Sequence, residues 1–205
     1  MVIYLHGFAS SSHSGKAVYL GQRLRERGVD YEAPDLNLPD FSTLTITRML
    51  EQTHALAARS PDPVTLIGSS LGAFVAINAA AAWPDRVARL VLLAPAIDLR
   101  DLGGAALEKW RRDGRMTIFH FGYGRMMDVH YELYEDARRY DAFDADVPMP
   151  TQIFQGRRDA LVNPKTVEAW AARRPNVELH LLDDEHQLAN SLSYIWSELQ
   201  RFLGV

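Results

Sequence analysis

The chain has 205 residues, of which 47% are hydrophobic and 23% are charged, and its formal net charge is −4 at pH 7. This length and balance suit one globular domain, residues 1–205, with a full hydrophobic core. The small negative charge gives no reason to expect binding to nucleic acid or to an anionic membrane. Because the sequence contains no cysteine, disulfides, thiolate catalysis and zinc–cysteine sites are excluded.

The sequence also bears on location. We find no run of apolar residues long enough to span a bilayer. The first residues, Met1 to Leu5, lack the basic region that opens a signal peptide. We therefore expect a cytoplasmic protein without a membrane segment, and nothing in the sequence specifies an oligomeric state.

Apolar, β-branched runs alternate with longer helical patterns along the chain. We expect strands at residues 2–5, around 31–33, 64–67, 87–93, 151–154 and 177–182. We expect helices at residues 16–27, 42–58, 71–82, 164–173 and 188–202. Several of the strands are apolar almost throughout, as in parallel strands covered on both faces. The alternation predicts an α/β fold with a doubly wound sheet.

The loop after the first strand resembles an anion-binding loop at first sight. A Walker A loop needs a Gly five places before its Gly-Lys and a hydroxyl after it, but these positions hold Ser10 and Ala17. A nucleotide phosphate is therefore not expected here, and Ser14 has the position of a helix cap. The stretch His6-Gly7-Phe8 needs another explanation.

A possible nucleophile lies between the strand at 64–67 and the helix at 71–82. The sequence Gly68-Ser69-Ser70-Leu71-Gly72 has the pattern G-x-S-x-G. A serine at the tip of a sharp strand-to-helix turn has a strained backbone, and flanking glycines let the two arms pass closely. This predicts Ser70 as the nucleophile, whereas Ser69 would point away.

A serine hydroxyl needs a base and an acid to become a strong nucleophile. Asp159 follows the strand at 151–154, and His186 follows the strand at 177–182. Both therefore belong to the carboxyl edge of a parallel sheet, where catalytic groups gather, in the order Ser, Asp, His. The rival acids Asp144 and Asp146 precede their strand, and we expect His180, inside a strand, to be a solvated edge residue.

Acyl transfer places negative charge on a carbonyl oxygen, which needs two N–H donors. One is expected from Leu71, the residue after the nucleophile, at the start of a helix. The other is expected from Phe8, in the loop after the first strand. His6 then has one of two roles that the sequence leaves open, ordering this loop through hydrogen bonds or a purely structural one.

Residues 98–146 interrupt the alternation and contain no run that we interpret as a strand. The segment is rich in aromatic residues and methionine, which is typical either of amphipathic helices packed on the sheet or of a helical lid. We expect it to shape a pocket for an acyl group. The substrate-binding candidates are Phe119, Phe121, Met126 and Met127.

Four stretches together resemble the α/β-hydrolase superfamily, and in particular its small bacterial serine carboxylesterases. They are Leu5-His6-Gly7-Phe8, the strand-to-helix turn at 68–73, Gly156-Arg157-Arg158-Asp159 and Asp184-Glu185-His186. The resemblance implies a minimal, mostly parallel sheet of about six strands, a Ser-Asp-His triad and no cofactor. The chain departs from the family in having no leading hairpin and no HGGG motif, which disfavours a lipase of the HGGG type.

These observations predict a serine hydrolase that cleaves small-molecule esters with short-to-medium acyl chains through an acyl-enzyme. An acyl-CoA thioesterase, with Arg111, Arg112 or Arg115 on the phosphates, remains open. An amidase or peptidase with the same triad and a non-catalytic binding protein of this fold also remain open. We expect no metal site, because none of four other histidines has ligand spacing: His6, His13, His120 and His130.

Overall fold

The computed structural model describes residues 1–99 and 104–205, and these form one main sheet and a small hairpin. The main sheet has six parallel strands in the order β2-β1-β3-β4-β7-β8. Their bounds are Val2–Leu5 (β1), Tyr31–Glu32 (β2), Val64–Ser69 (β3), Val87–Leu93 (β4), Thr151–Gly156 (β7) and Val177–Leu182 (β8). The predicted α/β class and the sheet of about six strands are confirmed.

Helices follow most strands of the main sheet. They are α1 (Gly15–Glu26), α2 (Ile46–Ala57), α3 (Leu71–Ala82), α6 (Pro164–Ala172) and α7 (Leu192–Leu203). Short 3-10 turns lie at Phe41–Thr43, Pro84–Arg86 and Ala189–Ser191. The Ser14 side chain accepts a hydrogen bond from the N–H of Ala17 and caps α1, as the sequence predicts.

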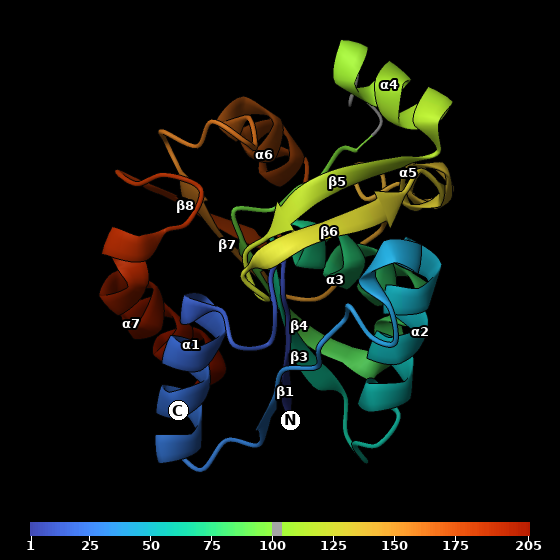
Figure 1. Cartoon of the computed structure of the whole chain (residues 1–205). Helices are drawn as coiled ribbons and strands as arrows, with labels where there is room; N and C mark the ends of the chain where they lie inside the picture. Colours follow the sequence, from blue (N-terminus) through green and yellow to red (C-terminus); the bar gives the residue numbers. More distant parts are fainter. Residues whose placement is uncertain (100–103) are drawn as a thin grey trace.

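Alternate residues of each strand supply two cores, one on each face of the sheet. Ile3 and Leu5 pack in a cluster with residues of α2, α3 and α6. Val2 and Tyr4 pack in a second cluster with residues of α1 and α7. Figure 1 shows α1 and α7 together on one side of the strands and α2 and α3 on the other. Covering both faces explains why several of the strands are apolar almost throughout.

The segment between β4 and β7 differs from the sequence prediction. It contains α4 (Ala105–Asp113), an antiparallel hairpin of β5 (Arg115–His120) and β6 (Arg125–His130), and α5 (Glu132–Ala137). The expectation of a wholly helical insert without strands is therefore wrong for residues 115–130. Residues 100–103 of the expected insert lie outside the described residues.

Buried and exposed residues alternate along the hairpin, but aromatic residues on the exposed face make this alternation hard to recognise in the sequence. Met116, Ile118 and His120 are at least half-buried, whereas the residues between them are exposed. One of those exposed residues is Phe119, which faces solvent opposite Met126. An apolar residue on the solvent face breaks the apolar–polar alternation by which a half-buried strand is recognised in sequence.

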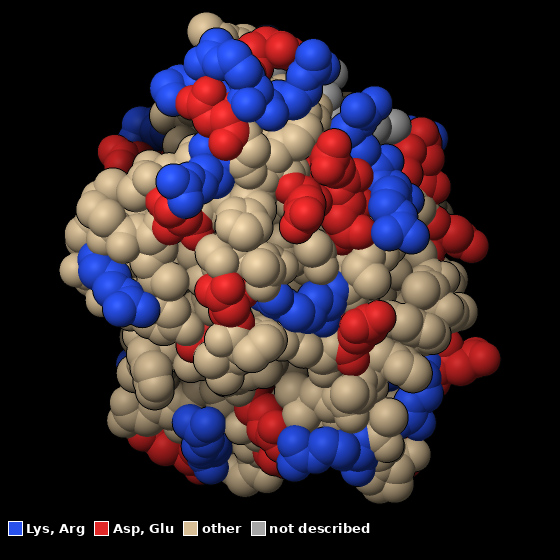
Figure 2. Space-filling view, turned by 45° about the vertical axis from the view of Figure 1, so that its right-hand side comes forward, with Lys and Arg blue, Asp and Glu red and all other residues tan. Residues whose placement is uncertain are grey.

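The hairpin lies across the carboxyl edge of the main sheet. In Figure 1 it crosses the ends of β1, β3 and β4, away from the chain's N-terminus. On the face shown in Figure 2, basic and acidic side chains are interspersed, with no broad area of one sign. Among the described residues, no helix has the length and apolar character needed to cross a membrane.

Candidate active site

Ser70 occupies a strained turn between β3 and α3. Its backbone angles are φ 53° and ψ −116°, a conformation that a residue with a side chain rarely adopts. Its N–H donates to the carbonyl of Leu93 at 3.0 Å, which ties the turn to β4. A Cβ at Gly68 would lie 2.5 Å from the Cα of Ala73, and one at Gly72 would lie 2.1 Å from the Leu5 carbonyl oxygen. Gly68 therefore lets the two arms of the turn approach each other, and Gly72 lets the start of α3 approach the end of β1.

A cavity of about 210 Å³ opens beside Ser70. Apart from Ser70 and Tyr134, its walls are apolar side chains. The insert contributes six of the lining residues, which are Leu99, Trp110, Met116, Leu133, Tyr134 and Ala137. The rest of the wall comes from Phe8, Ile46, Leu71 and Ala96.

The predicted substrate-binding residues lie elsewhere. Phe119, Phe121 and Met126 are 46%, 79% and 59% exposed on the hairpin, and Met127 packs half-buried against the core. None of these four belongs to the described residues that line the cavity at Ser70. The insert does line the cavity at Ser70, but through other residues. A side chain of the hairpin reaches the cavity only if it points toward the sheet, and those of Phe119, Phe121 and Met126 point to solvent instead.

His186 and Asp159 form a hydrogen-bonded pair at the same edge of the sheet. His186 Nδ1 lies 2.8 Å from Asp159 Oδ2, and the Asp159 side chain is wholly buried. Burial alone would raise the pKa of this carboxyl. Hydrogen bonds from His186, the Val162 N–H, Gln155 and the Leu161 N–H outweigh burial and hold the pKa below its ordinary value.

The ionised Asp159 fixes the state of the imidazole. A carboxylate can only accept hydrogen bonds, so Nδ1 of His186 carries a proton and donates it to Asp159. The other ring nitrogen, Nε2, then keeps a lone pair that can take a proton. The structure thus places Asp159 and His186 in the contact that the sequence predicts.

The loop that carries His186 has two further supports. Asp184 accepts hydrogen bonds from the N–H groups of Glu185 and Asn190 and from the Ser191 hydroxyl. Burial would raise the pKa of Asp184, but these hydrogen bonds lower it below its ordinary value. Buried Lys16 donates from Nζ to the Gln187 carbonyl at 3.1 Å. Sequence reasoning missed both roles, and Lys16 and Gln187 are 171 positions apart.

The loop after β1 runs beside the nucleophile. A Cβ at Gly7 would lie 3.2 Å from Ser70 Cβ. His6 Nδ1 donates to the Gly7 carbonyl at 2.9 Å, and His6 Nε2 accepts the Leu36 N–H at 3.0 Å. In a trans peptide the C=O and the following N–H point in opposite directions. The bond to His6 therefore fixes the direction of the Phe8 N–H, so His6 orders this loop.

Another group of side chains has metal-ligand chemistry. Within residues 1–99 and 104–205, the side chains of Glu178, His180 and Glu198 form a group whose spacing could hold a metal ion. Their donor atoms lie within 4.8 Å of one another. His180 bonds to the Tyr194 hydroxyl at 3.0 Å and stacks on Phe154, so its side chain is only 10% exposed. The expectation that His180 is solvated is therefore wrong, because α7 covers this side of β8.

Comparisons with solved structures show the α/β-hydrolase fold. The chain superposes on mouse α/β-hydrolase domain-containing protein 10 with a TM-score of 0.83 and 19% identity, covering 99% of this chain and 89% of that one. A structure of Est1E from Butyrivibrio proteoclasticus with ferulic acid bound gives 0.83 and 21%, with 98% and 87% covered. The monoacylglycerol lipase of Paleococcus ferrophilus gives 0.79 and 14%, with 98% and 93% covered.

At these identities the structural likeness establishes the fold alone. The search of curated proteins found no match. A sequence-family model matches residues 1–203, a span that includes the Ser70 turn, the His186–Asp159 pair and the insert. On that match, the chain belongs to the uncharacterised protein family UPF0227.

Proposed function

We propose that this protein is a serine hydrolase that cleaves carboxylic esters of short-to-medium acyl chains through an acyl-enzyme. One observation carries the proposal. The Ser70 turn opens on an apolar cavity, and an imidazole bonded to an ionised carboxylate, the His186–Asp159 pair, lies at the same carboxyl edge of the sheet. Similarity of fold to Est1E and to a monoacylglycerol lipase supports the choice of esters.

The proposed mechanism begins with His186 Nε2 taking the proton of the Ser70 hydroxyl as Oγ bonds to the ester carbonyl carbon. The electron pair of the C=O bond moves to oxygen, and the N–H groups of Phe8 and Leu71 stabilise this oxyanion. Collapse of the intermediate breaks the bond to the alcohol, which leaves with the proton from His186. Water then attacks the acyl-enzyme by the same steps and releases the acid.

The role given to Leu71 rests on its place in α3. It is the first residue of that helix, and the first N–H groups of a helix have no partner within it. The positive end of the helix dipole adds to the attraction for an oxyanion. The role of Phe8 rests on the orientation that His6 gives to the preceding carbonyl.

The cavity sets the size of the acyl group. At 210 Å³ it is smaller than the range of about 300–1,000 Å³ typical of sites for drug-sized ligands. A short or medium acyl chain would fill it and bury apolar surface at about 25 cal/mol per Å². A charged or strongly polar acyl group would find few partners among these walls.

The arginines considered for a thioesterase are occupied. Arg111 pairs with Glu108, Arg112 with Asp113 and Arg115 with Asp128, at 3.8, 3.1 and 3.6 Å. These exposed pairs lie on α4 and the hairpin. Since each guanidinium already faces a carboxylate, the arrangement favours a simple ester over acyl-CoA.

The test compares p-nitrophenyl esters from acetate to dodecanoate with matched acyl-CoA thioesters and anilides. Wild-type protein should prefer the esters. Ser70→Ala should lower kcat on the order of 10⁴-fold or more, because the nucleophile is lost. Ser197→Ala, on the exposed side of α7, is the matched control and should leave kcat unchanged.

Covalent labelling with a fluorophosphonate locates the nucleophile directly. The adduct should map to Ser70 and be absent from the Ser70→Ala protein. Full activity in the Ser70→Ala variant would exclude the mechanism. An unlabelled wild-type protein that hydrolyses none of these substrates would instead indicate a non-catalytic binding protein.

A further inference from the structure

The tip of the hairpin lies in direct contact with the loop that follows β1. The Gly122 N–H donates to the Ala9 carbonyl at 3.1 Å. A Cβ at Gly122 would lie only 2.7 Å from the Ser10 carbonyl carbon, so the two segments approach as closely as backbones allow. Ala9 itself has φ 52°, in the left-handed region. Such a conformation persists when its surroundings hold it, and the hairpin is one of the restraints.

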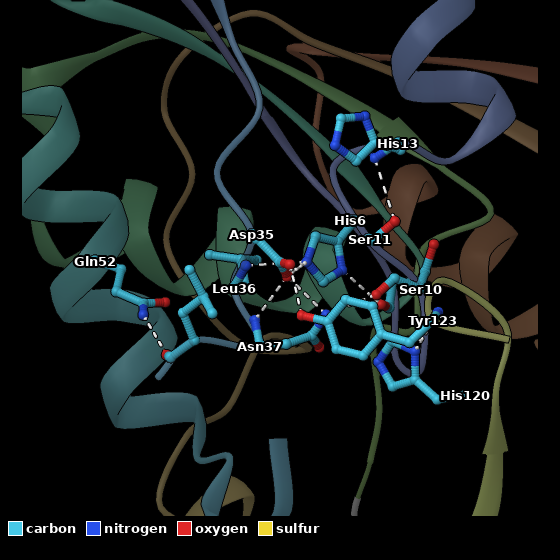
Figure 3. A network of polar contacts seen from close by, with 12 residues as sticks. His6, Ser10, Ser11, His13, Asp35, Leu36, Asn37, Gln52, His120 and Tyr123 are labelled. Carbon is cyan, nitrogen blue, oxygen red and sulfur yellow. Dashed lines mark hydrogen bonds and ion pairs between the residues drawn. The ribbon is translucent and has the colours of Figure 1, made fainter. Parts of the chain in front are cut away.

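A polar network extends this contact to His6 (Figure 3). The Tyr123 hydroxyl donates to Asp35 Oδ2 at 2.6 Å. The other oxygen of Asp35 accepts the backbone and side-chain N–H groups of Asn37 at 3.1 and 2.7 Å, and lies 3.3 Å from His6 Nε2. Asn37 also donates to the Ser10 carbonyl at 2.8 Å. The loop after β1 is therefore bound from two sides.

Asp35 can serve all these donors at once because it is ionised. Burial would raise its pKa, but contact with His6 and hydrogen bonds from Tyr123 and Asn37 outweigh burial and lower the pKa to about 2. The Tyr123 ring is held as well, since it stacks on His120 with 4.2 Å between centroids and 12° between planes. A donor fixed in place by stacking loses little freedom in making its bond.

Hydrogen bonds lead from this network to the oxyanion site. Asp35 precedes Leu36, whose N–H donates to His6 Nε2. The opposite nitrogen of the same ring donates to the Gly7 carbonyl and so orients the Phe8 N–H. At the opposite end of β5 from His120, and on the same face of the hairpin, Met116 lines the cavity at Ser70. One small element therefore contacts both the acyl pocket and the loop.

We propose that Tyr123 is a positioning residue that fixes the Phe8 N–H through Asp35 and His6, so that docking of the hairpin both closes the acyl pocket and forms the oxyanion hole. The inference rests on the proposed function for its kinetic consequence. Tyr123 touches neither the substrate nor the reacting atoms. It acts on catalysis only through the geometry of residues 6–11.

The test uses Tyr123→Phe, which removes the hydroxyl and keeps the ring that stacks on His120. We expect kcat for a preferred ester to fall on the order of 10-fold with KM within about 2-fold, because an oxyanion donor acts in the transition state. Amide hydrogen exchange of residues 7–11 should become faster. Asp35→Asn should act in the same direction, and the double variant should lose little more than Asp35→Asn alone.

Thr117→Val is the matched control. Thr117 bonds to Asp128 on the outer side of the same hairpin, away from the loop, so kcat and loop exchange should match wild type. An equal loss in Thr117→Val would overturn the proposal, since general loosening of the hairpin would then explain the effect. Unchanged loop exchange in Tyr123→Phe would overturn it too, whatever happens to kcat.

Hydrogen exchange also separates this inference from the proposed function. If wild-type protein hydrolyses no ester, the proposed function fails, yet faster exchange of residues 7–11 in Tyr123→Phe still shows that Tyr123 holds the loop. If esters are cleaved and Ser70 is essential while Tyr123→Phe behaves as wild type in both measurements, only the positioning role fails.

Discussion

The Ser70 turn can form only if residue 72 has no side chain. A methyl group at position 72 would collide with the backbone of Leu5 and His6, and neither can move without displacing β1. We predict that Gly72→Ala lowers the free energy of unfolding by about 3 kcal/mol, as overpacking does, and abolishes turnover. Urea denaturation and ester hydrolysis measure the two effects.

Gly15 provides the matched comparison for that substitution. It lies at the start of α1, and nothing stands within 4 Å of its Cβ position. Gly15→Ala should leave the protein as stable as wild type or stabilise it by up to about 1 kcal/mol. Equal stability losses in the two variants would show that the close approach at Gly72 is not the cause.

Asp159 holds the proton on the correct nitrogen of His186. Asp159→Asn keeps the size of the side chain but lets it donate a hydrogen bond, which permits the wrong imidazole tautomer. We predict a fall in kcat on the order of 10⁴-fold at neutral pH. Asp183→Asn, in the loop that carries His186 and with a largely exposed carboxylate, should retain wild-type kcat in the same ester assay. Similar losses in the two variants would contradict the special role of Asp159.

At the scale of elements, the main sheet could be predicted because most of its strands are short, largely apolar runs bounded by turns and helices. The order Ser70, Asp159, His186 could be assigned since each residue follows such a run. The hairpin could not, because Phe119 and Met126 place apolar side chains on its solvent face. The contacts of Lys16 and Tyr123 join segments that are far apart in sequence, so no local sequence pattern predicts them.

The inner walls of the insert should set the acyl preference. Ala137 is buried on the cavity wall, and Ala137→Leu would fill part of the space beside Ser70. We predict that kcat/KM for hexanoate falls about 10-fold or more while the acetate ester is retained, because each excluded methylene loses about 0.8 kcal/mol of burial. A series of p-nitrophenyl esters measures this.

Met126→Ala tests the opposite face of the hairpin. Met126 is 59% exposed and does not belong to the described lining residues, so the chain-length profile should match that of wild type. A shift of preference in Met126→Ala without one in Ala137→Leu would show that the outer face of the hairpin binds the acyl group.

For the molecule as a whole, buried Lys16 makes stability depend on pH. Burial lowers its pKa from 10.5 to about 8, despite attraction from Asp159 and Asp184. Between these values the unfolded chain binds more protons at this site than the folded chain, so stability rises with pH. From pH 8 to pH 10 the free energy of unfolding should gain about 2 kcal/mol from this residue.

Lys16→Met removes this dependence and keeps the apolar stem. The comparison ends near pH 10 because Tyr4 acts in the opposite direction above that pH. Burial raises the pKa of Tyr4 to about 12, so tyrosine ionises first in the unfolded chain, and this lowers the free energy of unfolding. Urea denaturation of both proteins at several pH values measures the difference between them. Parallel curves for wild type and Lys16→Met would show that Lys16 titrates alike in both states.

The reacting groups and the pocket walls come from different stretches of chain. Ser70, Asp159 and His186 follow strands of the main sheet, whereas seven of the eleven residues that line the cavity come from one continuous stretch between β4 and β7. If the proposed function holds, mutations in that stretch would change the preferred ester without altering the residues that break the bond. Within this family, selectivity should therefore diverge faster than chemistry, and exchange of the insert between relatives offers a direct route to engineered specificity.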